Sequence, residues 1–261
     1  WINQTGASTD TPSDLFFSDS HVLFTCQSDQ NTTIGSKTFS FSSKNMVYGE
    51  IDKSTGKIIW CNNIYNLTNS SDELIIRGIQ YLKGKFYLCG SVNKEIKIGT
   101  DTLYLGGFII QTDSAGNYQK KYSMYNTYFE SLTTDGIDLY FSGSTDLKPS
   151  SNFQEFFVGS LTSDLVIRWI YKPEFLDRYS TSGSGNLSKA TSNEGYIYFG
   201  GIFYSKLLIN GITLVPSGPG VDLLLLKMDY LGNVLWATSG NADIGVVLGL
   251  DAIAGKCVLA G

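Results

Sequence analysis

Histidine is the side chain best suited to moving protons near neutral pH, and the chain contains only one, His21. It follows Asp19 and Ser20 in a turn context, at the start of an expected strand. A Ser-His-Asp arrangement holds its histidine between a nucleophile and a carboxylate, and nothing in the sequence marks a serine as activated. We therefore expect His21 to be an exposed turn residue, and we predict no catalytic residue and no enzyme.

Cysteine is the next residue type with chemical potential, and the chain has four: Cys26, Cys61, Cys89 and Cys257. No pair has the C-x-x-C spacing of a zinc or redox site. Two of them, Cys26 and Cys89, occur at matching places in repeated segments, which favours a role as small buried fillers. We predict no metal and no cofactor, and the disulfide pairing of the four stays open.

Three turns combine an aspartate with a glycine, at 52–56, 113–116 and 229–232. Oxygen-rich turns suit calcium, but each of these turns offers only one such carboxylate. An aspartate also bonds its own turn backbone, and glycine adopts the left-handed conformation that tight hairpins need. We interpret the three segments as hairpin turns.

Aromatic side chains are the remaining candidates for ligand contacts. They gather in two stretches, as Tyr122, Tyr125, Tyr128, Phe129, Tyr171, Phe175 and Tyr179. Rings with a polar tip suit contacts with sugars or proteins, and the same rings would also cover the edge of a sheet. Both interpretations stay open, with glycans as the small-ligand alternative.

Two repeated phrases describe the elements that must position these residues. The first phrase is a short apolar strand ending in small residues, and it occurs at 21–28, 85–91, 138–144, 196–202 and 257–261. The second is a pair of strands flanking a turn, at 47–60, 108–122, 157–169 and 224–236. An apolar segment precedes each first phrase, so each unit has four strands. Three units also carry a related stretch between the phrases, at 32–39, 97–103 and 208–214, which we interpret as an extra hairpin.

Four short strands in units of about 48 to 67 residues predict the blades of a β-propeller. We predict an all-β chain with four-stranded antiparallel blades, folded as a single propeller domain over residues 1–261. The expected blades cover approximately 1–59, 60–120, 121–168 and 169–235, with a partial blade at 236–261. About four and a half blades are therefore expected, in an incomplete propeller.

The segment YIYFGGIFYSKLLINGITLVPSGPGVDLLLLKMDYLGNVLWATSG, at 196–240, resembles the repeats of seven-bladed β-propeller proteins. GEIDKSTGKIIW, at 49–60, is also similar to the tryptophan-docking motif of quinoprotein-like propellers, in which the tryptophan wedges against a neighbouring blade. Both resemblances imply a fold and no particular function. Tryptophan recurs about once per unit, as Trp1, Trp60, Trp169 and Trp236. Because an active site is needed only once, we predict that these tryptophans pack blades together.

Charge and apolar content exclude two classes of partner. A net charge of −5 and a pI near 4.9 provide no basic surface for nucleic acid. No apolar run is long enough to span a membrane.

Five glycosylation sequons begin at Asn3, Asn31, Asn66, Asn69 and Asn186. With the low charge content, they predict a glycoprotein that is secreted or displayed at the cell surface.

Repetition without a singular reactive group predicts a non-catalytic extracellular scaffold, adhesion or assembly propeller within a larger glycoprotein. A glycan-binding, lectin-like propeller is the alternative, and a quinoprotein-like oxidoreductase is a remote one, because the chain shows no cofactor ligands. Other protein subunits or domains are the expected partners. The open last blade has three explanations: the sequence is a piece of a longer chain, further blades follow, or another subunit donates strands.

Overall fold

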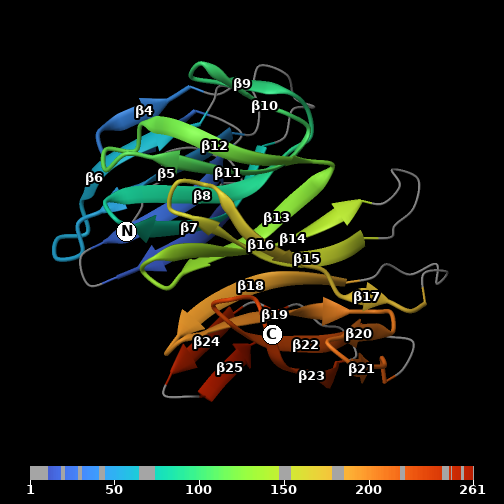
Figure 1. The fold of residues 1–261 in the computed structure, drawn as a ribbon. Coiled ribbons are helices and arrows are strands. Elements are labelled where there is room, and N and C mark those ends of the chain that lie inside the picture. Colours follow the sequence, from blue (N-terminus) through green and yellow to red (C-terminus); the bar gives the residue numbers. More distant parts are fainter. Residues whose placement is uncertain are drawn as a thin grey trace. The chain divides into compact units, whose positions relative to one another are not determined.

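The computed structural model of the 261-residue chain describes residues 11–18, 21–28, 31–40, 45–64, 74–146, 154–177, 185–217, 221–242, 247, 249–253 and 256–260. Strands and turns account for the regular structure of these residues, and helices are absent from them. No helix in this part of the chain is therefore long and apolar enough to cross a membrane. The chain divides into two compact units, Trp1–Asn126 and Thr127–Gly261 (Figure 1).

The N-terminal unit contains two four-stranded antiparallel sheets. Sheet 1 has the order β1 (Thr11–Phe17), β2 (Val22–Ser28), β5 (Asn45–Ile51), β6 (Ile58–Asn63). Sheet 2 has the order β7 (Leu74–Leu82), β8 (Lys85–Val92), β11 (Gly106–Thr112), β12 (Tyr118–Tyr125). Two short hairpins join the second and third strands of these sheets, β3 (Thr32–Ile34) with β4 (Lys37–Phe39) and β9 (Ile96–Ile98) with β10 (Asp101–Leu103).

The C-terminal unit repeats this plan twice and then begins it again. Sheet 3 has the order β13 (Thr127–Thr134), β14 (Asp138–Asp146), β15 (Gln154–Thr162), β16 (Ile167–Tyr171). Sheet 4 has the order β18 (Gly185–Asn193), β19 (Tyr196–Phe203), β22 (Val221–Asp229), β23 (Val234–Ala242). Sheet 5 consists of β24 (Gly249–Ile253) and β25 (Lys256–Ala260). A small sheet joins β17 (Glu174–Phe175), β20 (Leu207–Ile209) and β21 (Ile212–Leu214).

The predicted fold class is confirmed: the described chain is all-β, with four-stranded antiparallel propeller blades and one partial blade. In every complete sheet the first two strands form a hairpin, and the last two form another (Figure 1). The grouping of residues 1–261 into one domain, with the blade boundaries given above, stays a prediction.

The extra hairpins pack on the outer strand of their own sheet. In sheet 1 the Lys37 ammonium donates to the main-chain oxygen of Cys61 on β6, at 2.7 Å. Gly35 turns this hairpin at a φ of 62°, and a Cβ there would lie 3.1 Å from Cβ of Ile58. The turn therefore favours glycine for its conformation and for its close approach to β6.

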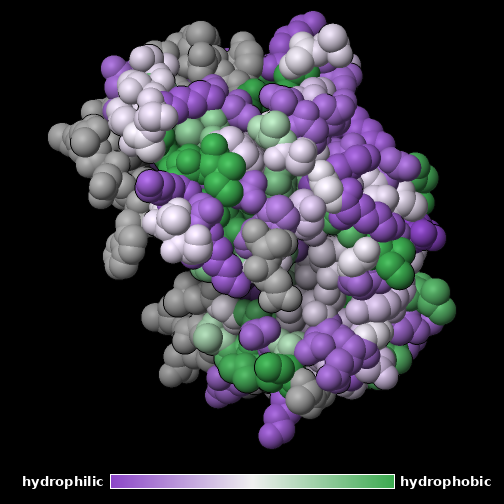
Figure 2. All heavy atoms as spheres, turned by 90° about the vertical axis from the view of Figure 1, so that its left-hand side faces the viewer, coloured by the Kyte–Doolittle hydropathy of each residue, from purple (hydrophilic) through white to green (hydrophobic). Residues whose placement is uncertain are grey.

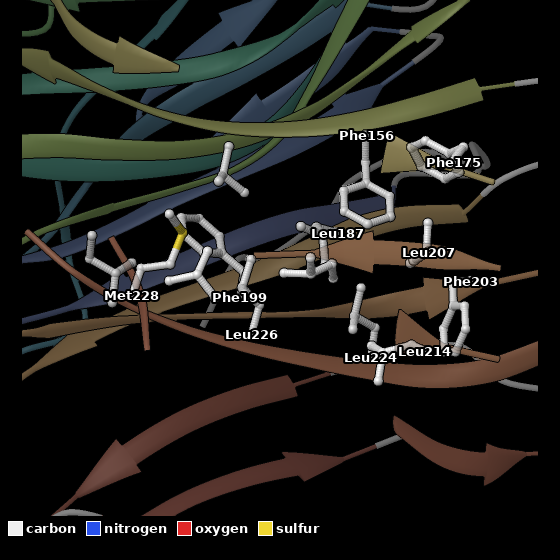
Figure 3. Close-up of a cluster of buried hydrophobic side chains, with 14 of the residues drawn as sticks. Phe156, Phe175, Leu187, Phe199, Phe203, Leu207, Leu214, Leu224, Leu226 and Met228 are labelled. Carbon is white, nitrogen blue, oxygen red and sulfur yellow. The ribbon is translucent and has the colours of Figure 1, made fainter. Parts of the chain in front are cut away.

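The apolar core lies between consecutive sheets. In the N-terminal unit, Leu23 of sheet 1 and Leu88 of sheet 2 share one buried cluster. In the C-terminal unit, Tyr140 of sheet 3 and Phe199 of sheet 4 share another, drawn in part in Figure 3. We call the side of a sheet that carries Leu23 or Tyr140 its forward face, and the side that carries Leu88 or Phe199 its rear face. Each junction in these units joins a forward face to the rear face of the next sheet.

Candidate functional site

Two of the tryptophan rings pack against glycines in turns of the following sheet. A Cβ on Gly116, in the β11–β12 turn of sheet 2, would overlap the ring of Trp60 on sheet 1. A Cβ on Gly232, in the β22–β23 turn of sheet 4, would lie 2.8 Å from the ring of Trp169 on sheet 3. Each ring thus lies directly on a turn of the following sheet. Trp236 is partly buried on β23, and Trp1 lies outside the described residues. A role in packing alone stays a prediction for all four.

His21 is not the exposed turn residue that the sequence led us to expect. Its side chain is 21% exposed, and its Nδ1 lies 2.6 Å from a carboxylate oxygen of Glu50. The other oxygen of Glu50 accepts the indole N–H of Trp60, at 2.8 Å. The imidazole also packs on Tyr81, with ring centroids 4.0 Å apart. Glu50 is 29 positions away in sequence, so local sequence context could not reveal this partner.

The aromatic candidates separate into core and surface residues. Phe129 and Phe175 are buried, with 0% and 2% exposed, so they are core residues and not ligand contacts. Tyr125 is 74% exposed at the end of β12. Three others are partly buried, namely Tyr122, Tyr128 and Tyr171, and Tyr179 lies outside the described residues. Side chains alternate between the two faces of strand β13, and this alternation places Phe129 on the buried face. The sequence analysis grouped the aromatic residues by their closeness in sequence and did not use this alternation.

The aspartate turns bind their own backbone. Asp52 accepts hydrogen bonds from the hydroxyls and N–H groups of Ser54 and Thr55 at 2.7–3.0 Å. These bonds, that from the Ser54 hydroxyl first, lower the pKa of Asp52 from 3.8 to about 2. In the described part of the chain, no three His, Cys, Asp or Glu residues group as a metal site would require.

None of the four cysteines forms a disulfide bond in this structure. Three of them are buried, Cys26, Cys61 and Cys89, and Cys257 is partly buried. The strand register corrects the sequence match between two of them. Cys26 pairs with Val47, whereas Gly90, not Cys89, occupies that position in sheet 2 and pairs with Phe108.

The glycosylation candidates are only partly described. Asn31 is exposed immediately before β3, and Asn186 is partly buried within β18. Asn3, Asn66 and Asn69 lie outside the described residues. Glycosylation of any of the five stays a prediction.

A β-bulge interrupts the first strand of every complete sheet. The pairing shifts between Pro12 and Asp14, Ile76 and Gly78, Phe129 and Ser131, and Asn186 and Lys189. The small residues that end the first phrase accommodate this feature. A Cβ on Gly90 would overlap the carbonyl oxygen of Ile75, and a Cβ on Gly201 would overlap that of Asn186. The small residues at the end of the first phrase were therefore a sequence signal for the bulges, although we had interpreted them only as the end of a strand.

The bulges carry different side chains on the same backbone. Asp14 follows the bulge in sheet 1, Arg77 is the extra residue in sheet 2, and Glu130 is the extra residue in sheet 3. Arg77 is exposed, and the two carboxylates are partly buried. Charged residues make up only 16% of the chain, and one lies at or directly after each of these three bulges. Bulges occur beside active sites, where they redirect a side chain.

Hydrogen bonds anchor these bulges to the next sheet within each unit. Oδ2 of Asp14 accepts the main-chain N–H of Ile79 on β7, at 3.0 Å. In the C-terminal unit, the Ser142 hydroxyl donates to the main-chain oxygen of Leu187, at 2.5 Å, and lies 2.5 Å from the hydroxyl of Ser131. The bulges are therefore held in defined positions. We take Asp14 and Arg77 in one unit, and Glu130 in the other, as the candidate functional residues.

No protein-family model matches the sequence, and no curated protein matches it. Among solved structures, the chain is similar to a subtype N10 neuraminidase-like protein of A/little yellow-shouldered bat/Guatemala/060/2010. The identity is 9% and the TM-score 0.42, over 92% of this chain and 63% of that one. It is also similar to an exo-1,5-alpha-L-arabinanase from a bovine ruminal metagenomic library. There the identity is 10% and the TM-score 0.42, over 88% of this chain and 77% of that one.

These comparisons correct two of our predictions. We predicted a non-catalytic scaffold, adhesion or assembly propeller, with a lectin-like propeller as the alternative, and we predicted that the chain is not an enzyme. Both of the structures named above are β-propellers, and their names are those of a neuraminidase-like protein and an arabinanase, so the two predictions are wrong. A sequence repeat reveals blades because they recur, whereas a reactive group that occurs once leaves no repeat. At identities near 10% no residue role is carried over to this chain.

Proposed function

We propose that this chain is a carbohydrate-active propeller of the glycoside hydrolase type, with its reactive side chains at or beside the bulges in the first strands of its sheets. One observation carries the proposal: a bulge recurs in the first strand of each complete sheet, and in three of them a charged side chain lies at or directly after it, Asp14, Arg77 or Glu130. A packing device repeats its residue, as the tryptophans do. A bulge that repeats its backbone but changes its charged side chain is typical of a functional position.

The chemistry of these side chains fits sugar hydrolysis. Glycosidases act through aspartate and glutamate side chains. One carboxyl group protonates the oxygen of the glycosidic bond, and another attacks the anomeric carbon or activates the water that attacks it. Asp14 and Glu130 are such carboxylates, each at a bulge of its own unit. The guanidinium of Arg77 offers donors in a fixed fork, which suits hydroxyl or carboxylate groups of a sugar.

The test is hydrolysis of a panel of aryl glycosides and polysaccharides by the purified 261-residue chain, measured as released phenol or reducing sugar. We expect turnover of at least one substrate. At least one of the variants Asp14→Asn and Glu130→Gln is expected to lower it by about 100-fold or more, as the loss of an acid–base group does. Arg77→Met is expected to raise KM more than it lowers kcat, because it removes a binding group.

Asp52→Asn is the matched control, because Asp52 is a carboxylate in a repeated turn whose oxygen bonds its own backbone. Its turnover should equal that of the unsubstituted chain. The proposal is overturned if no substrate is hydrolysed, or if turnover survives both carboxylate substitutions.

We also propose that the sheets belong to the repeat type of seven-bladed propeller proteins, which the segment at 196–240 resembles. The experiment is a count of blades in electron-microscopic class averages of the native protein. Seven blades are expected, and any other number contradicts the assignment.

Secretion or cell-surface display is a further part of the proposal, supported by the sequons and by the exposure of Asn31. Removal of N-glycans from the native protein should lower its mass, and Asn31→Gln should remove one step of that change. A native protein whose mass is unaffected by N-glycan removal would contradict this.

A further inference from the structure

Sheet 2 is basic, although the chain as a whole is acidic. Residues 74–126, which form this sheet and its connections, contain seven Lys and Arg residues against three Asp and Glu residues, a net charge of +4. The whole chain has a net charge of −5, so the residues outside sheet 2 carry −9. A local charge opposite in sign to that of the rest of the chain favours an anionic partner.

Two of the three carboxylates of this sheet already hold hydrogen bonds within it. Asp101 accepts the hydroxyl of Tyr118. Asp113 accepts the main-chain N–H of Asn117 in its own turn, at 2.9 Å. Glu95 is the third carboxylate, and it is exposed. The excess of positive charge therefore comes from side chains of which several lie at the surface.

The β9–β10 hairpin packs on β12 and brings two lysines together (Figure 1). Lys97 is exposed and pairs with Thr102 across the hairpin. The ammonium group of Lys121, on β12, donates to the main-chain oxygen of the same Thr102. It also lies 5.0 Å from the centroid of the Tyr104 ring. Two cationic side chains and an aromatic ring thus meet around one residue of the hairpin.

A second aromatic ring lies beside the first. Tyr104 is 55% exposed, and Tyr125 is 74% exposed. The residue after each tyrosine bonds the other, because the main-chain oxygen of Leu105 accepts the N–H of Asn126 at 3.3 Å. A Cβ on Gly106 would lie 2.3 Å from a main-chain oxygen of β12. The segment that carries Tyr104 is therefore held closely against the end of β12.

The other hairpins of the repeat lack these charged groups. The residues equivalent to Lys97, by their pairing across the hairpin, are Thr33 in sheet 1 and Leu208 in sheet 4. A lysine is therefore not needed to pack the hairpin. The upper part of Figure 2, at the height of β9 and β10 in Figure 1, is mainly hydrophilic. The basic aromatic surface, as we call it, consists of Lys97, Lys121, Tyr104 and Tyr125.

We propose that the basic aromatic surface binds an acidic oligosaccharide, a chain of sugars that carry carboxylate groups. The ammonium groups attract the carboxylates, and exposed rings with a polar tip contact the faces of the sugars. The proposal names the substrate class of the proposed hydrolase and rests on that function, which restricts the anionic ligand to a sugar. Arg77 of the candidate site lies in the same basic sheet.

The experiment measures binding to the purified 261-residue chain by calorimetry, with a hexamer of galacturonic acid as the probe. The methyl ester of the same hexamer is the matched control ligand, because it keeps the sugar rings and loses the charges. We expect the acid to bind about tenfold or more tightly than the ester, and less tightly as salt is added. A hexaglutamate peptide and a single-stranded DNA hexamer should also bind about tenfold or more weakly than the acid, because neither presents a chain of sugar rings to the tyrosines.

Two variants test the surface itself. Lys97→Glu and Tyr125→Ala should each weaken binding of the acid by about tenfold, since each removes one of few contact groups. Lys57→Glu is the matched control, because Lys57 is exposed on the β5–β6 turn of sheet 1 and the change in net charge is the same. Its affinity should equal that of the unsubstituted chain. Circular dichroism identifies a variant that fails to fold, and Lys97→Gln and Tyr125→Ser then replace the two variants.

Several results would overturn the proposal. Equal affinity for the acid and its methyl ester is one, and equal or tighter binding of the peptide or the DNA is another. A chain that hydrolyses neutral polysaccharides but does not bind the acidic hexamer also overturns it, and leaves the proposed function standing. Specific binding of the acidic hexamer by a chain that hydrolyses no substrate supports the binding surface and overturns the proposed function instead.

Discussion

The two tryptophan junctions, one in each unit, share a backbone and differ in their polar chemistry. Trp60 and Trp169 each lie on a turn glycine of the following sheet. The indole N–H of Trp60 donates to the Glu50 carboxylate, at 2.8 Å. The indole N–H of Trp169 donates instead to the main-chain oxygen of Tyr230, at 3.2 Å. The repeat therefore requires the contact between ring and glycine, but either a side chain or a neighbouring backbone can accept the indole hydrogen.

The residue paired with each tryptophan across its own sheet explains this difference. Glu50 pairs with Trp60, and Ser160 pairs with Trp169. Glu50 is 7% exposed and bonds both the indole and His21. Ser160 is fully buried, and its hydroxyl has no hydrogen-bond partner within the described residues. The residue at this position thus accepts two side-chain hydrogen bonds in one unit, whereas in the other its hydroxyl makes none within the described residues.

The largest expected effect comes from Gly116→Ala. Gly116 has a φ of 77°, and its Cβ would overlap Trp60. We expect a loss of about 2–4 kcal/mol in the free energy of unfolding, the sum of backbone strain and overpacking. Gly84→Ala is the matched control, because Gly84 has a φ of 78° and no atom within 4 Å of its Cβ position. Urea denaturation measures both, and the difference isolates the tryptophan contact.

The second junction supplies a parallel pair. Gly232 and Gly195 have φ values of 92° and 89°, and only Gly232 faces a tryptophan. Gly232→Ala should cost more than Gly195→Ala, and the difference should be smaller than at Gly116, where the Cβ would lie closer to the ring. Equal losses at all four glycines would show that φ alone decides and that the ring contact contributes nothing.

Glu50→Ala and Ser160→Ala test the polar difference directly. Glu50→Ala removes the acceptor of an indole and of an imidazole, and we expect a loss of about 2–3 kcal/mol. Ser160→Ala removes a buried hydroxyl without a partner, so stability should stay unchanged or rise slightly. Thermal and urea unfolding of both variants measure this. Similar losses at the two positions would contradict the distinction between the junctions.

The smallest expected effect is the acid sensitivity of one turn. The pKa of Asp52 is about 2 in the folded chain, below its usual value of 3.8. A carboxyl whose pKa is lowered by folding contributes stability that is present above pH 4 or so and is lost as the pH falls toward about 2. In the Asp52→Asn variant, the unfolding midpoint should therefore decrease less than in the unsubstituted chain as the pH is lowered from about 4 to about 2.

The equivalent turn of sheet 3 is the control for that effect. There Thr162 stands in place of the aspartate, and its hydroxyl accepts the N–H groups of Asp164 and Val166 at 3.2 Å. Thr162→Ala should lower the unfolding midpoint by a similar amount at every pH, because a hydroxyl does not titrate in this range. An acid-dependent effect of Thr162→Ala would contradict the role given to the Asp52 carboxyl.

Much of the fold could be predicted because it repeats. The strand phrases, the glycine turns and the extra hairpins each recur, so one copy supports the interpretation of another. The candidate site could not be predicted in this way. Arg77 and Glu130 are the extra residues of their bulges and Asp14 follows its bulge, a relation that appears only once the strand pairing is known, because the sequence around the three residues has no common letter. The contact between His21 and Glu50 was hidden for a related reason, since it joins separate strands.

The sequence by itself determined the class of sheet, since alternating apolar residues and turn glycines act locally, within a few positions along the chain. It also showed that a tryptophan and a turn glycine recur in successive repeat units. Only the tertiary structure decided which surface each of these residues meets. Strand pairing and sheet packing bring together residues that are far apart in the chain, so the contact of Trp60 with Gly116 is a property of two neighbouring sheets.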